Sequence, residues 1–180
     1  IRDSCARVVF YTYCQPLLRP ETHKMRESHL AHAEEAHREA RRSLRRYGLE
    51  EGRCAFDVPL RSEALGLTGR ADLVVRAADE VVPVEYKNTF RKPGRHWALQ
   101  VAAYGLMLEE MGWGRVRRGL LYAIPTRAVD EVSLTARRLG QVRSLVAAMR
   151  EMVECERMPA APSGRGRCAA CEFRRVCNDV

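Results

Sequence analysis

The sequence lacks the segments that carry a chain into or across a membrane. No run of about 20 apolar residues occurs in it, which excludes a membrane-spanning helix, and no charged segment leads into an apolar one, which argues against a signal peptide. It also lacks an initial methionine, because it begins at Ile1. We therefore expect a cytoplasmic protein with one domain over residues 1–180, trimmed or excerpted from a longer chain.

Acidic side chains are in the minority. The 31 Lys and Arg residues outnumber 23 Asp and Glu residues, which gives a formal net charge of +8 and a pI near 9.4. Most of the excess is arginine, which binds phosphate in bidentate fashion and stacks on bases. Nucleic acid is therefore the expected partner. A GC-rich genome, which favours arginine codons, would give the same balance in a protein that binds no nucleic acid.

The seven cysteines include no compact run of four such as ferredoxins carry, which argues against an electron carrier. Three of them, Cys168, Cys171 and Cys177, lie within ten residues near the end. In a cytosolic protein such a cluster is more often a set of metal ligands than of disulfides. A tetrahedral zinc site or an iron–sulfur cluster needs one more ligand. Cys14 is predicted to supply it, and the spacing does not separate zinc from iron.

The centre of the sequence predicts a β-hairpin over residues 67–90. Two nearly continuous apolar runs, 73–75 and 81–84, flank a turn at 77–80. Such runs are typical of strands that are covered on both faces. The other predicted elements are a helix over 23–47, a strand over 54–61 with Phe56, Val58 and Leu60 on one side, a helix over 96–111, strands over 115–124 and 129–134, and a helix from Thr135 to about Cys155. This order indicates an α/β protein.

Two carboxylates and a lysine lie at one edge of the hairpin. Glu85 and Lys87 are two residues apart and so project from the same face of a strand, and ordinary pairing brings Asp72 level with them. Neighbouring carboxylates repel unless a positive charge lies between them, and magnesium or manganese prefers such oxygen ligands. Lys87 is then free to contact a phosphate or a water. The alternative is an ordinary exposed cross-strand pair.

Two helices carry further candidates. On the helix over 23–47, Met25, His29, His32 and Ala36 share one face, and spacing alone does not choose between the two histidines. On the helix over 96–111, Gln100 and Tyr104 lie four residues apart and share a face. This pair can either meet a substrate phosphate or pack in the core.

In their order along the chain, these features resemble the RecB-type branch of the PD-(D/E)XK nucleases. The resemblance rests on the inward histidine, Gly69-Arg70-Ala71-Asp72, Glu85-Tyr86-Lys87, Gln100-x3-Tyr104, and one early plus three late cysteines. It is closest to the CRISPR-associated exonucleases of the Cas-four family, and it covers the chain from Cys14 to Cys177. The helix motif of that family is Gly-x-x-x-His. Residues 28–32 match it with Ser28 in place of glycine, which favours His32 and keeps His29 as the alternative.

The resemblance implies a restriction-endonuclease-like fold, with a mixed sheet flanked by helices in a core of about 23–156. It implies an iron–sulfur module built from 1–22 and 157–180. The implied ligands of a four-iron four-sulfur cluster are Cys14, Cys168, Cys171 and Cys177. The implied ligands of Mn²⁺ or Mg²⁺ are His32, Asp72, Glu85 and the carbonyl of Tyr86. In the same scheme Lys87 activates the attacking water, and Gln100 and Tyr104 contact DNA.

The resemblance further implies a prokaryotic enzyme that trims single-stranded 3′ overhangs of CRISPR prespacers at a recognised adjacent motif. It would work in complex with the CRISPR integrase, or fused to it, and a chain that lacks methionine and ends at Val180 fits the nuclease part of such a fusion. The alternative is a DNA-binding iron–sulfur or zinc subunit without cleavage activity. The charged candidates for the DNA path are Arg41, Arg42, Arg91, Lys92, Arg95, Arg165 and Arg167.

Overall fold

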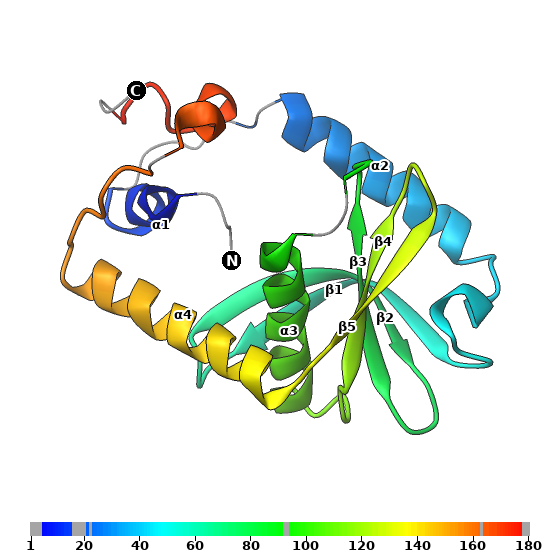
Figure 1. Ribbon diagram of the computed structural model, residues 1–180. Helices are drawn as coiled ribbons and strands as arrows, with labels where there is room; N and C mark the ends of the chain where they lie inside the picture. The colour runs from blue at the N-terminus through cyan, green and yellow to red at the C-terminus, as the bar shows by residue number, and fades with distance from the viewer. Residues whose placement is uncertain (1–4, 16–20, 22, 92–93, 163, 178–180) are drawn as a thin grey trace.

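The computed structural model describes residues 5–15, 21, 23–91, 94–162 and 164–177. Within these residues, five strands form one sheet that helices surround (Figure 1). The strands are β1 (Arg53–Ser62), β2 (Leu67–Arg76), β3 (Val81–Lys87), β4 (Arg118–Ala123) and β5 (Ala128–Ser133). The helices are α1 (Ala6–Tyr13), α2 (His23–Glu39), α3 (Arg95–Glu110) and α4 (Ala136–Glu154), with short 3-10 helices η1 (Leu44–Tyr47) and η2 (Arg165–Ala170).

The strands lie across the sheet in chain order, from β1 to β5. Neighbours are antiparallel except for β3 and β4, which are parallel and are connected through α3. Helices α3 and α4 lie on one face of the sheet and α2 lies on the other (Figure 1). The predicted mixed sheet flanked by helices is therefore confirmed.

An apolar core fills each side of the sheet. The core under α3 and α4 includes Val58, Leu60, Val74, Leu108 and Val142. The core on the α2 side includes Tyr47, Leu73, Val82, Tyr86 and Tyr122. Each fully buried side chain of this size contributes roughly 1.5–3 kcal/mol. Gly119 lets α3 approach β4 closely, because a Cβ there would lie 2.3 Å from Cγ1 of Val101.

The hairpin of β2 and β3 has the predicted form. Its turn is closed by a hydrogen bond of 2.9 Å from the amide of Ala77 to the carbonyl of Glu80. Val74, Val82 and Val84 have no exposed surface, so both strands are covered on both faces as predicted.

The pairing of β1 with β2 is interrupted at Asp57 and Asp72. Phe56 pairs with Leu73 and Val58 pairs with Ala71, but the two aspartates between them form no ladder pair. Asp57 has a left-handed backbone (φ 54°), which aspartate adopts more readily than most residues. The alternation of side chains shifts there, so Phe56 packs in the core under α2 and Val58 packs in the opposite core. The prediction that Phe56 shares a side with Val58 was wrong for this reason.

The predicted helix over 23–47 is shorter than expected. Helix α2 ends at Glu39, and the chain then turns into η1, where the hydroxyl of Ser43 accepts a hydrogen bond from the amide of Arg45. This break turns Tyr47 into the core, where its hydroxyl donates a 2.8 Å hydrogen bond to Oε2 of Glu39. Gly48 ends the segment in the left-handed conformation, as its residue type predicts.

Helix α1 and the C-terminal segment that follows α4 lie side by side (Figure 1). The ring of Tyr11 in α1 stacks on Phe173, with centroids 5.5 Å apart, and Nε of Arg7 donates to the carbonyl of Pro159 at 2.8 Å. Helix α1 also packs on α4, whose start is capped by Thr135 as predicted. Residues 1–22 were expected to form a short ordered lead-in that ends in a loop, and α1 is its ordered part; residues 1–4, 16–20 and 22 lie outside the described part.

None of the described helices is both long enough and apolar enough to span a membrane.

Candidate active site

Asp72 and Glu85 lie where β2 and β3 separate. The last pair of the hairpin ladder at this end joins Leu73 to Val84, so the two carboxylates follow directly. Oδ2 of Asp72 accepts a 2.7 Å hydrogen bond from the amide of Tyr86. A side chain thus takes the place of a main-chain partner, and this bond holds the Asp72 carboxylate at the fork between the strands.

His32 approaches the same carboxylate from α2. Its Nδ1 lies 3.0 Å from Oδ1 of Asp72, and its ring meets the ring of Tyr86 edge to face at 5.9 Å. Ser28, which stands where the family motif has glycine, places its Oγ 3.5 Å from Nε2 of His32. The side chain of His29 is 74% exposed and lies near Glu21 instead. The structure therefore brings His32, and not His29, to the carboxylates.

Glu85 and Lys87 form a close pair on the α3 side of β3. Nζ of Lys87 donates to Oε1 of Glu85 at 2.7 Å, which confirms that these side chains share a face. Glu85 is only 5% exposed. Burial, and secondarily the negative charge of Asp72, raises the pKa of the Glu85 carboxyl to about 7. The charge of Asp72 thus disfavours the ionised form of Glu85.

Gln100 and Tyr104 support this pair from α3. The Gln100 amide donates to Oε1 of Glu85 at 2.8 Å and to the Tyr104 hydroxyl at 2.7 Å, and it accepts from Nζ of Lys87 at 3.0 Å. Nζ of Lys87 also lies 5.5 Å from the centre of the Trp97 ring. Tyr104 is 6% exposed, and burial raises the pKa of its phenol. In this arrangement Gln100 and Tyr104 face the catalytic candidates, and their predicted contact with DNA stays a prediction.

The donor chemistry at the fork fits a hard divalent cation. Asp72 and Glu85 offer carboxylate oxygens, His32 offers an imidazole nitrogen, and a cation between the carboxylates would relieve the repulsion that raises the pKa of Glu85. These side chains bond to one another here. No three His, Cys, Asp or Glu side chains in the described part of the chain are arranged so that they could hold a metal ion.

A buried ionic network that the sequence did not predict fastens α2 to the sheet. Glu35 and Glu39 are buried, and both accept from Nη1 of Arg42, at 2.6 and 2.7 Å. Oε1 of Glu35 also accepts a 2.8 Å hydrogen bond from the hydroxyl of Tyr122 in β4. Burial raises the pKa of Glu35, but these hydrogen bonds outweigh burial and hold that pKa below its ordinary value. Arg42, a charged candidate for the DNA path, is instead committed to this network.

Four of the seven cysteines lie where α1 meets the C-terminal segment. Cys5, Cys14, Cys171 and Cys177 pack around the apolar cluster of Val8, Phe10, Tyr11 and Phe173. Sγ of Cys14 lies 3.8 Å from the carbonyl of Val153. Burial raises the pKa of the Cys171 thiol, and the negative charge of the neighbouring Glu172 raises it further. Cys5 was missed by the sequence reasoning, although it is, like Cys14, an early cysteine in a segment that reaches the C-terminal group.

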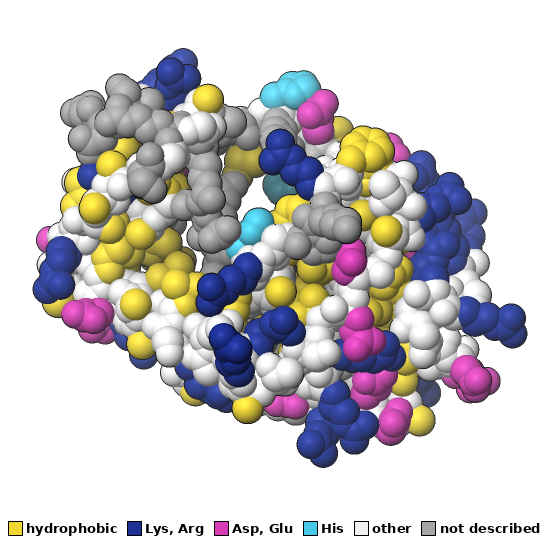
Figure 2. All heavy atoms as spheres, viewed as in Figure 1, with side chains coloured by type: hydrophobic (Ala, Val, Ile, Leu, Met, Phe, Trp, Pro, Cys, Tyr) yellow, Lys and Arg dark blue, Asp and Glu magenta, His cyan; other side chains and the backbone are white. Residues whose placement is uncertain are grey.

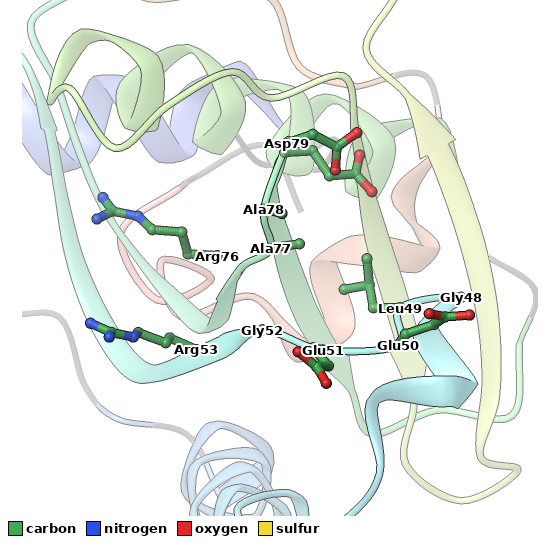
Figure 3. Close-up of a pocket in the computed structure, with 11 residues that line it drawn as sticks. Gly48, Leu49, Glu50, Glu51, Gly52, Arg53, Arg76, Ala77, Ala78 and Asp79 are labelled. Atoms are coloured by element: carbon green, nitrogen blue, oxygen red, sulfur yellow. The ribbon is translucent and has the colours of Figure 1, made fainter.

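A separate hollow lies at the opposite end of the hairpin, beside the turn at 77–80 (Figure 3). Arg53 and Arg76 lie together at one end of it, and acidic side chains including Glu51 and Asp79 lie elsewhere on its wall. None of the catalytic candidates lines this hollow, so it does not belong to the site at the fork. Figure 2 shows Lys and Arg side chains gathered at several places on one face of the molecule.

Comparisons with known proteins agree with the geometry. The model of the PD-(D/E)XK nuclease superfamily matches residues 6–178. The CRISPR-associated exonuclease Cas4 of Aeropyrum pernix is 31% identical over 180 residues, which cover 96% of this chain and 88% of that protein. The protein of the same name from Francisella tularensis subsp. novicida is 27% identical, with 97% and 88% covered.

Two further similarities are partial. A CRISPR-associated exonuclease Cas4/endonuclease Cas1 fusion of Geobacter sulfurreducens is 29% identical over 131 residues, which cover 68% of this chain and 23% of the fusion. The crystal structure of SSO0001 has a TM-score of 0.55 at 18% identity and covers 87% of this chain and 70% of that one. The second likeness supports the fold alone.

Proposed function

Because this chain belongs to the PD-(D/E)XK nuclease superfamily, and within it to the family of the CRISPR-associated exonuclease Cas4, we propose that it hydrolyses DNA with Mn²⁺ or Mg²⁺ at the fork of β2 and β3. The observation that carries the proposal is the unbroken set of contacts from His32 through Asp72 to the Tyr86 amide, beside the Glu85–Lys87 pair. Carboxylates, an imidazole and a lysine at one point match the needs of phosphodiester hydrolysis.

Asp72, Glu85 and His32 would hold the metal ion, with the Tyr86 carbonyl as a further ligand. When bound, the ion polarises a phosphoryl oxygen and lowers the pKa of an attacking water. Lys87 positions that water or the phosphate through Nζ, which Gln100 orients at 3.0 Å. His32 fixes the Asp72 carboxylate from one side while the Tyr86 amide fixes it from the other. Such outer contacts keep ligands in productive geometry.

The substrate we propose is the single-stranded 3′ overhang of a CRISPR prespacer, cut at a recognised adjacent motif in a prokaryotic cytoplasm. The excess of Lys and Arg over Asp and Glu favours binding to a phosphate backbone. The similarity to part of a Cas4/Cas1 fusion supports work beside an integrase, either in a complex or in one polypeptide. A DNA-binding subunit without cleavage activity is the alternative that the experiment below separates.

The cofactor we propose where α1 meets the C-terminal segment is a four-iron four-sulfur cluster. Cys168, Cys171 and Cys177 would supply three thiolates, and Cys14 was predicted to supply the fourth. Cys5 is a second candidate for that place, because it packs, as Cys14 does, against the same apolar cluster as Cys171 and Cys177. Iron analysis of Cys5→Ser and Cys14→Ser, each purified anaerobically, decides between them: the true ligand loses iron and the other variant keeps it.

The test of the proposed activity is cleavage of a labelled single strand with Mn²⁺ by anaerobically purified protein. Wild type should cut, Lys87→Ala and Asp72→Ala should not, and Glu63→Gln should cut as wild type does, since the Glu63 side chain is 78% exposed and outside the site. Cleavage that is unchanged in both site variants would refute the assignment. A wild type that binds DNA but never cuts, even with the integrase added, would support the non-cleaving subunit.

A further inference from the structure

Phe90 has the most exposed large apolar side chain in the described part of the chain. Its exposure is 82%, against 70% for Tyr13 and 63% for Leu30. It belongs to none of the apolar clusters that the described residues form. An aromatic ring contributes most when it is covered, and this ring is open to a ligand that could cover it.

Phe90 lies close to the active site along the chain. β3 stays paired to the end of its catalytic segment, because the Lys87 carbonyl accepts a 3.0 Å hydrogen bond from the amide of Ile124. Phe90 follows Lys87 by three residues, so their Cα atoms lie at most about 11 Å apart. Oγ1 of Thr89 accepts from the amide of Arg91 at 3.1 Å, and this turn presents Phe90 at its apex.

The neighbouring charge suits a nucleic acid. Arg91 is exposed and directly follows the ring, so a cation that can bind phosphate lies next to a surface that can stack on a base. An aromatic platform combined with backbone-binding cations is the usual means of holding a single strand without reading its sequence. A protein partner would explain the exposed ring, but it would not need the adjoining cation or the position beside Lys87.

We propose that Phe90 stacks on a nucleobase adjacent to the phosphate bound at Lys87 and thereby selects single-stranded DNA. A base within a duplex has both faces covered by its neighbours, so only an unpaired strand can offer this contact. The inference rests on the proposed function and deepens it, because it names the group that places the strand over the carboxylates.

The test pairs a change in the protein with a change in the DNA. Wild type, Phe90→Ala and Phe90→Tyr are assayed with Mn²⁺ on an intact single strand and on strands that carry one abasic site at successive positions around the cut. Phe90→Ala should lower kcat/KM by about 5- to 150-fold on the intact strand, the effect of stacking on one base. Phe90→Tyr should restore it. At one position the abasic site should slow wild type by a similar factor and leave Phe90→Ala no worse.

The matched control is Met111→Ala, which removes an apolar side chain that is 42% exposed at the far end of α3 and should change nothing. Binding is read separately from cleavage. Without a divalent cation, one of a set of strands that carry 2-aminopurine at successive positions should lose fluorescence on binding to wild type and keep it on binding to Phe90→Ala.

Equal kcat/KM for Phe90→Ala and wild type on every strand, together with equal 2-aminopurine signals, would overturn the inference while leaving the proposed nuclease intact. A partner protein would then be the remaining candidate for covering the ring. Loss of 2-aminopurine fluorescence without any cutting by wild type would support the stacking and refute the proposed activity.

Discussion

Tyr122→Phe removes the hydroxyl that connects α2 to β4. That hydroxyl donates to Oε1 of Glu35 at 2.8 Å and accepts from Nη1 of Arg46 at 3.0 Å. The ring is fully buried, and phenylalanine fills the same space, so the change leaves no large cavity. A hydrogen bond to a buried charged group contributes about 1.5–3 kcal/mol. Glu35 keeps its 2.6 Å hydrogen bond from Arg42, so its charge is not left unpaired. We therefore expect the free energy of unfolding to fall by about 1.5–2 kcal/mol, the lower part of this range.

The same change should also affect catalysis. Glu35 follows His32 by about one turn of α2, so a looser Glu35 should let His32 shift against Asp72. We expect kcat/KM to fall about 10-fold, at the low end of the effect of groups that orient metal ligands. Urea unfolding and Mn²⁺-dependent cleavage measure the two effects. Tyr47→Phe is the control, because it takes a hydroxyl from Glu39, farther from His32, and should cost stability with less activity. A Tyr122→Phe variant within about 0.5 kcal/mol of wild type would refute the reasoning.

Four further outcomes follow from the site. Asp72→Asn should reduce single-turnover cleavage on the order of 100-fold or more, because it removes the negative charge that would hold the metal ion; near-normal rates would contradict this. Gln100→Ala frees Nζ of Lys87 and should cost about 10- to 100-fold in kcat, measured at saturating DNA. The folded pKa of Glu85, about 7, exceeds its ordinary 4.5 because of burial, so metal-free stability should fall as pH rises across that window, by at most about 3 kcal/mol. Urea titrations should show that Glu85→Gln lacks this fall. Cys171→Ser should lose folded protein and iron together, and intact protein without iron would argue against a structural cluster.

The sheet was predictable because its signals are local. The apolar runs at 73–75 and 81–84 set both the hairpin and its burial, and Thr135 marked the start of α4. The end of α2 at Glu39 was not predictable. It depends on a buried hydrogen bond with Tyr47 and on a core that only the folded chain assembles.

The catalytic candidates were predictable to the same extent. Period-two alternation placed Glu85 and Lys87 on one face, and ordinary pairing placed Asp72 beside them. The choice between His29 and His32 needed the family motif, and the contact with Asp72 agrees with it. The Glu35 contact with Tyr122 joins residues far apart in sequence, and no spacing rule reports such a pair.

The central claim is that the carboxylates at the fork hold the metal ion that cuts DNA. Its most direct test is Mn²⁺ binding, followed by electron paramagnetic resonance, on wild type, Glu85→Gln and the surface control Glu63→Gln, with cleavage assayed on the same samples. We predict that Glu85→Gln stays folded, since it removes a charge that burial disfavours, and that it loses both Mn²⁺ binding and cleavage while the control keeps both. A folded Glu85→Gln protein that binds Mn²⁺ and cuts DNA as wild type does would contradict the account.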